Sequence, residues 1–481
     1  MVVGETGHTE GVTPDPRDAR IAELEALVSK LLARDAEREE LLAKLEKRVE
    51  ELEEKLAASS RNSSKPPSSD PPTVERKPKA PTGRKRGGQP GHKKHERELF
   101  PPEKVGKVLE CKPSHCDRCR GRLHGHDERP WRHQVAELPK IEPEVTEFRL
   151  HELVCSCGHR TRAKLPPGTP TGAFGATVVA AITLLLGVYG LSRRDTAELL
   201  RDMFSLPISV GGVVGCQRLG AAALAASHEE AQAEVPKAPI KYSDETGWKL
   251  GDVYACLWVV VTAKVTVFRI QAARSRQAAM KVLGSVSGFL GSDRYSVYDC
   301  WPTHMHQFCW AHLSRLFVHF SERRDPTVKA LGLALIEEKN RMFEWWYRVR
   351  DGTLTRTTFK RYMLPVQRRV TALLEEGASS SCAKTQRTCL RLLQSHHALW
   401  TFVYKEGLEP TNNAAERAIR RPVIIRKTSF GSQSEHGCRF LERVLTVHAT
   451  LRQSGRSVHD FIAAACKAHF RGEPPPALLT P

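Results

Sequence analysis

The chain has 481 residues, with 74 Lys or Arg against 55 Asp or Glu, so its formal charge at neutral pH is +19. This length allows several domains and a substantial core, and the surplus of positive charge favours a polyanionic partner. Thirteen cysteines without an N-terminal secretory signal argue against a disulfide framework and indicate a reducing, cytoplasmic setting.

The N-terminal region predicts a disordered segment over residues 1–20, followed by a coiled coil over residues 21–58. Apolar residues keep a heptad spacing, with Asp35 and Arg38 interrupting it midway; the apolar positions are Ile21, Leu24, Val28, Leu31, Leu42, Leu45, Val49, Leu52 and Leu56. A helix gains most of its stability by packing its apolar face, so we expect self-association through this segment. A helical hairpin that turns at the interruption, or a lone solvated helix, are the alternatives.

Residues 59–100 predict a basic linker rich in Pro, Gly and Ser. Its first part, SSRNSSKPPSSDPP, has too little apolar content to bury a core. Between Arg76 and Arg97, nine Lys or Arg stand against one Glu. Such a segment neutralises phosphates and gives salt-sensitive, sequence-independent DNA affinity; a solvated charged linker is the alternative. The candidate DNA contacts here are Arg84, Lys85, Arg86, Lys93 and Lys94.

Residues 101–168 predict a small zinc-binding module. Two close cysteine pairs, Cys116 with Cys119 and Cys155 with Cys157, suit one structural, tetrahedral Zn²⁺, because each short turn aims two thiolates at one point. The second pair has a single intervening residue, so another side chain is a candidate to replace one ligand: Cys111, His115, His151 or His159. Reduced, unligated cysteines are the alternative.

Residues 169–236 predict a helical domain. Ser192 and Ser209 are expected as N-caps of its second and third helices. The third, residues 210–226, carries one basic residue, so we expect packing rather than base reading. The run Ala173–Leu191 is long and uncharged enough to raise the question of a membrane span, and a buried helix is the preferred interpretation.

Residues 237–472 carry three acids at the boundaries of predicted elements. Asp244 is expected at the end of a strand in IKYSDETGW, which is followed by further strands over residues 253–270. Asp293 follows a short apolar run, and Glu416 opens a helical segment. If the three carboxylates converge, cations must neutralise them, and hard divalent ions such as Mg²⁺ or Mn²⁺ prefer oxygen ligands. This indicates phosphoryl chemistry.

Six segments in a fixed order resemble the insertion sequence 66 (IS66) family of transposases: RNSSKPPSSD, RKRGGQPGHKK, YSDETGW, SDRYSVYD, CWAHLSR and NNAAERAIRRP. The resemblance implies an α/β RNase H-like catalytic domain with a helical insertion over residues 313–408 and a DDE triad of Asp244, Asp293 and Glu416. It implies two catalytic Mg²⁺ or Mn²⁺ ions, cleavage of DNA at transposon ends, and transfer of the freed 3′-hydroxyl to target DNA. Accessory proteins encoded by such elements are candidate partners, and a cytoplasmic, nucleoid-associated location without membrane contact is expected.

Several assignments keep alternatives. Glu245 and Asp299 compete with Asp244 and Asp293, and Glu416 also fits a capping box closed on Asn413. Basic residues after Glu416 are candidate phosphate contacts, with a solvated helix face as the alternative: Arg417, Arg420 and Arg421.

The run THMHQFCWAH resembles the start of a helix more than a second zinc site, and the role of His312 stays open. Two helices are expected over residues 441–470, and a tail over residues 473–481. A non-catalytic, zinc-containing DNA-binding protein and a nuclease without strand transfer are the alternative functions.

Overall fold

The computed structural model describes residues 16–63, 70 and 97–479. They fall into two compact units: the first unit combines residues up to 74 with residues 308–406, and the second combines residues 75–307 with residues 407–481. Each unit is built from two separated stretches of chain. The segment expected as a helical insertion therefore belongs to a different unit from the strands that precede it.

The second unit contains a five-stranded mixed sheet with the order β5-β4-β3-β6-β7. Its strands are β3 (Ile240–Leu250), β4 (Val253–Val261), β5 (Thr266–Gln271), β6 (Phe289–Ser292) and β7 (His306–Phe308). β4 pairs antiparallel with both β3 and β5, whereas β6 runs parallel to β3. Six consecutive residues of β4, from 255 to 260, are buried, so both faces of this central strand are covered. The strands predicted over residues 253–270 are confirmed.

The outer edge of β5 is bonded by the side chains of a helix, α13 (Glu435–Gln453). The backbone N–H groups of Thr266, Phe268 and Ile270 donate to Thr450 Oγ1, Thr446 Oγ1 and Glu442 Oε1, at 3.2, 3.0 and 2.5 Å. Two residues of a strand rise about 6.6 Å and four residues of a helix about 6 Å, so the two repeats stay in step. The helix thus satisfies alternate donors of an edge strand.

The helices of the second unit lie before, between and after these strands in the sequence. They are α2 (Ala176–Gly187), α3 (Arg193–Phe204), α4 (Val210–Ala223), α5 (Ala225–Glu234), α6 (Arg276–Leu283), α12 (Asn413–Ser429), α13 and α14 (Val458–Arg471), with short 3-10 turns η2 (Pro102–Lys104), η3 (Val235–Lys237), η4 (Ser296–Tyr298) and η5 (Thr303–Met305). Ser192 and Ser209 cap α3 and α4 by accepting from the N–H groups of Asp195 and Gly212, as predicted. The predicted third helix is shorter than expected, because α4 ends at Ala223 and α5 begins two residues later.

The apolar run Ala173–Leu191 forms α2, which has 12 residues and packs against α14 and α4. Val179, Ala180 and Ile182 are fully buried there, as expected for a core helix. Within the described part of the chain, no helix has the length and apolar character needed to cross a membrane.

The first unit is helical. It comprises α1 (Pro16–Ala57), α7 (Trp310–Ser321), α8 (Pro326–Arg350), α9 (Arg356–Ala378), α10 (Ala383–Gln394) and α11 (His396–Tyr404). Trp346 of α8 is buried against Phe359 and Phe402, with ring centroids 5.7 and 5.3 Å away. This confirms core packing for Trp346, whereas its neighbour Tyr347 is exposed.

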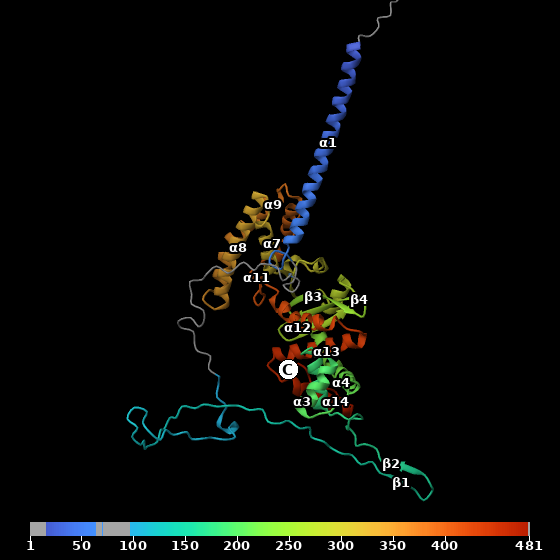
Figure 1. Cartoon of the computed structure of the whole chain (residues 1–481), viewed down its shortest axis with the longest axis vertical. Coiled ribbons are helices and arrows are strands. Elements are labelled where there is room, and N and C mark those ends of the chain that lie inside the picture. The colour runs from blue at the N-terminus through green and yellow to red at the C-terminus, as the bar shows by residue number, and fades with distance from the viewer. Residues whose placement is uncertain (1–15, 64–69, 71–96, 480–481) are drawn as a thin grey trace, which may run out of the picture. The chain divides into compact units, whose positions relative to one another are not determined.

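α1 is a single continuous helix of 42 residues (Figure 1). The alternative of a helical hairpin turning near Asp35 and Arg38 is therefore wrong, because both residues lie inside regular helix. Charged residues are tolerated there since their side chains are exposed, and neither removes a backbone hydrogen bond.

The segment just after α1 is more ordered than the linker predicted from its composition. Ser59 and Asn62 are buried, and the Ser59 N–H donates to Asn62 Oδ1 at 2.8 Å. Arg61 bonds Glu322, the residue that follows α7, and Asn62 Nδ2 donates to the same carboxylate at 2.8 Å. Hydrogen bonding supplies here the order that apolar content does not, so the linker prediction is wrong for residues 59–63.

We predict that Gly332→Ala loosens the packing of α7 on α8. A Cβ at Gly332 would lie 2.3 Å from the backbone nitrogen of Ser321 and 2.7 Å from the carbonyl carbon of Phe320, and backbone cannot rotate away. We expect a loss of about 1–3 kcal/mol in the local free energy of unfolding, measured by hydrogen exchange of the α7 and α8 amides. The control Leu333→Ala, at an exposed position of the same helix, should change exchange by less than about 0.5 kcal/mol. Equal protection in both variants would contradict the close approach.

Candidate active site

Strand register brings Asp244 and Asp293 together. The parallel pairing of β3 with β6 ends at Tyr242 opposite Gly291, and each acid follows its paired residue by two positions. Asp244 lies inside β3 and not at its end, so that part of the prediction is wrong. The reason is that β3 goes on pairing with β4 as far as Leu250 after β6 has ended. One carboxylate thus stands on a rigid strand and the other on the loop beside it.

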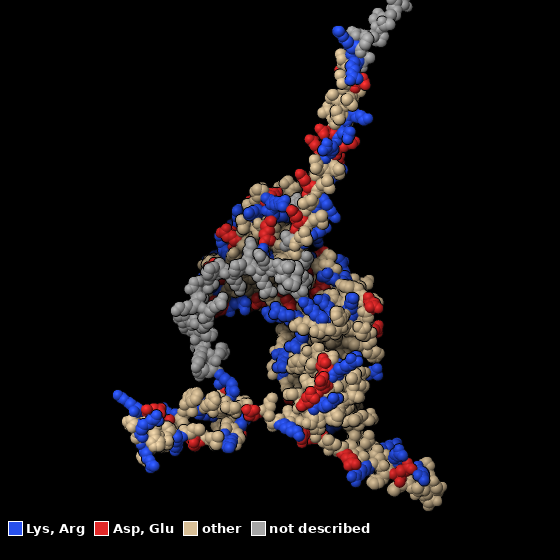
Figure 2. Space-filling model, in the orientation of Figure 1, with Lys and Arg blue, Asp and Glu red and all other residues tan. Residues whose placement is uncertain are grey.

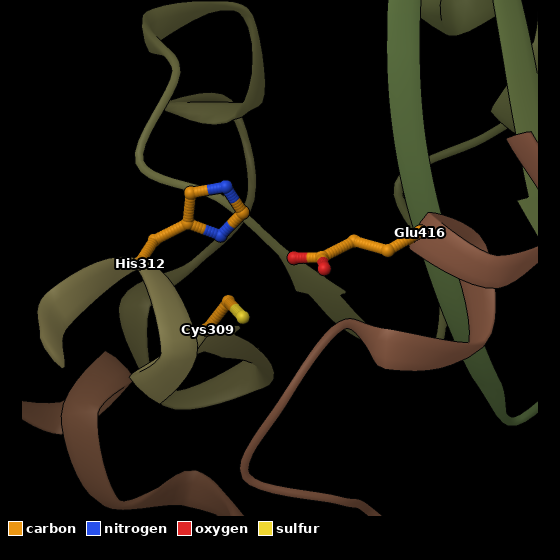
Figure 3. A group of neighbouring side chains, drawn as sticks. All are labelled: Cys309, His312 and Glu416. Carbon is orange, nitrogen blue, oxygen red and sulfur yellow. The ribbon is translucent and has the colours of Figure 1, made fainter. Parts of the chain in front are cut away.

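Helix α12 brings Glu416 to the same place. The Asn412 side chain, just before the helix, donates from Nδ2 to the backbone oxygen of Ser243 at 2.7 Å. Towards the other end, Arg426 donates to Thr246 Oγ1 at 2.8 Å and also bonds the Gly247 oxygen. α12 is therefore tied to β3 on both sides of Asp244, and Figure 3 shows Glu416 projecting from its first turn.

The capping-box alternative for Glu416 is not realised. α12 begins at Asn413, its N-cap is Asn412, and no side chain makes a cap hydrogen bond there. Glu416 is the fourth helical residue and not the third, because the helix starts one residue earlier than that alternative requires. The Asn412 amide is used instead to hold the helix on the sheet.

Like charges crowd around Asp244. Burial, followed by repulsion from Glu245, Asp293 and Glu416, raises the pKa of Asp244 well above its usual range. Burial also raises the pKa of Asp293, to which Glu416 adds repulsion. The acids are thus near enough to oppose one another's ionisation. Among the described residues, however, the three carboxylates do not gather into one group with their oxygen atoms within 4.8 Å of one another. Their donors are all oxygen atoms, which fits a hard divalent cation.

Glu245, the competitor of Asp244, is held in a hydrogen-bond network. Its side chain is 1% exposed and accepts from Tyr298 Oη at 2.6 Å and from Arg274 Nε at 3.1 Å. The Arg274 guanidinium lies 4.0 Å from the Tyr295 ring centroid, and the Tyr295 N–H donates to Asp293 Oδ1 at 3.0 Å. Glu245 thereby braces the loop that carries Asp293.

Sequence reasoning missed Arg274, Tyr298 and Asn412 in these positions. Asn412 lies inside the motif NNAAERAIRRP, but its spacing gives no sign that it bonds a strand 169 residues earlier. Asp299, the other competing acid, is exposed.

The histidines before α7 do not form one cluster. His306 is buried, its Nε2 lies 2.8 Å from Ser292 Oγ, and burial lowers its pKa to about 3, so it is neutral. Cys309 and His312 lie at the start of α7, with their potential ligand atoms within 4.8 Å of each other (Figure 3). Helix formation in CWAH, as predicted, places these two side chains one turn apart.

Both cysteine pairs occupy tight turns between short paired segments. Cys155 and Cys157 lie in the turn that joins β1 (Glu152–Val154) to β2 (Arg160–Arg162), closed by a 2.8 Å bond from the Cys155 N–H to the His159 oxygen. Cys116 and Cys119 lie in a turn closed by a 2.9 Å bond from the Cys116 N–H to the Gly121 oxygen. The strand before the second pair is short, because only residues 152–154 pair with β2.

Each turn directs hydrogen-bond donors at its first thiol. The backbone N–H of Cys119 is the main cause of a lowered pKa for Cys116, and that of Cys157 has the same effect on Cys155. Among the residues described, the four sulfur atoms do not gather into one group of three or more. The structure therefore shows two separate cysteine pairs, each in a turn that lowers the pKa of its first thiol. The binding of one Zn²⁺ by both pairs stays a prediction.

The basic candidates divide into two sets. The five linker residues, Arg84, Lys85, Arg86, Lys93 and Lys94, lie outside the described residues. On α12, Arg417 and Arg420 are exposed, three positions apart. Arg421 donates to the Val188 oxygen at 2.8 Å and lies over the Tyr189 ring, so it also links α12 to the end of α2.

We predict that Asp244→Asn stabilises the metal-free protein at neutral pH. The raised pKa of Asp244 means that its contribution to stability is present at acid pH and is lost as the pH rises through the folded-state pKa. Urea unfolding in a chelator should show the variant more stable than the native chain by more than about 0.5 kcal/mol near pH 8. The difference should vanish near pH 3–4, close to the ordinary pKa of about 3.9. Exposed Asp252→Asn is the control; an Asp244 variant that is less stable at pH 8 would refute the repulsion.

Parts of this chain match known protein families and a known protein. Residues 11–98 match a family of unknown function (DUF6444). An uncharacterized protein y4qI from Sinorhizobium fredii (strain NBRC 101917 / NGR234) is 26% identical over 229 residues, which cover 44% of this chain and 41% of that protein. The chain thus matches less than half the length of this relative.

Residues 171–439, more than half of the chain, match the family described as "Transposase IS66 family". The matched range contains β3, β6 and the start of α12, and with them all three acids. The chain belongs to the IS66 family of transposases.

Proposed function

We propose that this protein is a DDE transposase that cleaves DNA at transposon ends and transfers the 3′-hydroxyl to target DNA. The observation that supports this most directly is the register of β3 and β6, which sets Asp244 beside Asp293, with Glu416 close enough to raise the pKa of Asp244. Family membership supports the transposase function in general. We assign the mixed sheet to the RNase H-like class on the same grounds.

Asp244, Asp293 and Glu416 are the proposed ligands of two Mg²⁺ or Mn²⁺ ions. Bound ions of this kind activate the attacking oxygen and stabilise the leaving oxygen of a phosphodiester. The protein's part is to hold the carboxylates: Asn412 and Arg426 fix α12, and the Glu245–Arg274 pair fixes the Asp293 loop. No covalent link between protein and DNA is required.

Arg417 and Arg420 are the proposed phosphate contacts next to these acids. Both are exposed and lie in the turn that follows Glu416. Guanidinium groups three residues apart on a helix share a face and donate to phosphate oxygens from fixed directions. With the basic linker, they provide affinity that falls as salt rises.

A non-catalytic DNA-binding protein is the alternative from another class. A protein that had lost cutting would have no need to keep Asp293 and Glu416 where they raise the pKa of Asp244, since that repulsion opposes folding. A nuclease without strand transfer differs only in its second step, so a pre-cut end with a free 3′-hydroxyl separates it from a transposase.

We predict that Glu416→Gln abolishes cutting and joining while DNA binding is kept. On DNA from the ends of the protein's own element with Mg²⁺, we expect the cleavage rate to fall about 100-fold or more, because an oxygen ligand is lost. Gel-shift affinity should change by less than about threefold. Asp299→Asn, an exposed acid near the site in sequence, should cut like the native chain. Parallel loss of binding and cutting, or unchanged cutting, would count against the assignment.

A structural Zn²⁺ held by Cys116, Cys119, Cys155 and Cys157 is the second proposal. The two turns offer paired sulfur donors with lowered pKa at the first thiol of each, which fits a soft, tetrahedral site. Apolar residues in this region are widely exposed, among them Val135, Leu138 and Val145, so a cation joining the turns would supply order that a core does not.

We predict that Cys116→Ser removes bound zinc. Mass spectrometry of the dialysed native chain should find about one zinc atom per chain, and the variant should hold less than about a fifth of that, because three remaining ligands bind far more weakly. Cys300→Ser, outside both turns, should keep the metal. Zinc absent from the native chain, or present equally in the Cys116 variant, would refute this site.

A further inference from the structure

The stripe of apolar side chains along α1 is uncovered among the described residues. Every apolar heptad residue on it is at least 45% exposed, and Leu56 reaches 87%. Leu27, Leu32 and Leu41, beside the stripe, are also exposed. Contiguous apolar surface of this extent marks a site of association. The stripe runs from Ile21 to Leu56, which at 1.5 Å per residue is about 53 Å of the helix.

The residue types along the stripe favour two parallel strands. Counting Ile21 as position a, three of the six a positions are β-branched, the other three being Asp35, Leu42 and Leu56, and the d positions are Leu except at Arg38. β-branched residues at a with Leu at d favour a parallel two-stranded coiled coil.

Charges beside the stripe complement one another in a parallel pair. In that arrangement each g residue faces the e residue five positions later on the other helix. The g and e pairs are Arg20 with Glu25, Leu27 with Leu32, Arg34 with Glu39, Leu41 with Glu46, and Arg48 with Glu53. Three pairs join opposite charges, one joins two apolar residues, and none joins like charges. Figure 2 shows basic and acidic side chains interspersed along α1.

The antiparallel arrangement is weaker. Full overlap would set Asp35 opposite Arg38 of the second copy, which suits those two positions. It would also place Arg20 near Lys55 and Glu25 near Glu46, and so join like charges at both flanks. In the parallel arrangement Asp35 faces Asp35 and Arg38 faces Arg38 of the second copy, and Arg34 and Glu39 of that copy lie beside them as counter-charges.

We propose that α1 binds a second copy of this chain as a parallel, in-register coiled coil, with Arg20 and Glu25 of opposite copies pairing across the interface. The C-terminal end of α1 is anchored within the same unit. Arg61 and Asn62, which follow the helix, bond Glu322, and Arg324 bonds Glu53 of the helix at 2.6 Å. Parallel pairing therefore brings the helical bundles of two copies, α7 to α11, to the same end of the coil. This inference does not depend on DNA cleavage.

The test is a charge swap in the full-length chain, followed by sedimentation equilibrium. Arg20→Glu and Glu25→Arg should each raise the dimer dissociation constant about tenfold at low salt, because each turns two attractive pairs into repulsive ones. The double variant Arg20→Glu/Glu25→Arg should return to within about threefold of the native value, since the a and d residues beside this pair, Ile21 and Leu24, carry no charge. Lys30→Glu, a reversal at an outward position, should have no effect, and circular dichroism should show equal helix content throughout.

Three outcomes would overturn the proposal. A native chain that is monomeric at micromolar concentration would exclude the interface. A double variant that is as weak as the single ones would exclude the parallel register. Single variants that dimerise as tightly as the native chain, or more tightly, would favour the antiparallel arrangement, in which Arg20 lies near Lys55 and Glu25 near Glu46 of the second copy.

Discussion

The repulsion among acidic side chains around Asp244 is the constraint on which the second unit depends. Carboxylates held together in a poorly hydrated place oppose one another's ionisation, and a flexible scaffold would let them separate. Here each of the three acids has its own structural restraint. Asp244 is set within a strand that is paired on both edges, Asp293 follows a strand in parallel register with it, and the helix of Glu416 is tied to the same strand at two points. The positions of Asp244 and Asp293 follow from backbone pairing, which side-chain motion cannot easily relax, whereas the helix of Glu416 is held by the side chains of Asn412 and Arg426.

A fourth acid shows how the fold keeps this crowding tolerable. Glu245 is adjacent to Asp244 and almost completely buried, and it has an arginine and a tyrosine as partners. Buried charge is stable only when it is paired and hydrogen-bonded. Because Arg274 also stacks on Tyr295, which bonds Asp293, the same cation that neutralises Glu245 stiffens the neighbouring loop. Neutralisation of one acid and positioning of another thus come from one network.

Local chemistry predicted local structure well in this chain. Ser192 and Ser209 were recognisable as N-caps, and the alternating apolar residues before Ile270 as strands, because each pattern depends on near neighbours. The same reasoning failed wherever the partner is distant. It ended β3 at Asp244 since the pairing with β4 beyond that point is invisible in the motif, and it took residues 59–63 for linker since Glu322 lies 260 positions from Asn62. The three acids were found by an ordered set of motifs, whereas the residues that position them carry no local signal.

The helix that lies along β5 has a consequence for how copies of this protein meet. The unpaired backbone N–H groups of an edge strand can normally pair with an extended segment of another chain. Such pairing extends the sheet and can begin fibrous aggregation. At Thr266, Phe268 and Ile270 those donors are already occupied by Thr450, Thr446 and Glu442. A stray strand would have to displace a whole helix to add itself on that side. Growth of the sheet across this border is thereby blocked, and the sheet keeps its five strands even when copies of the protein are brought close together.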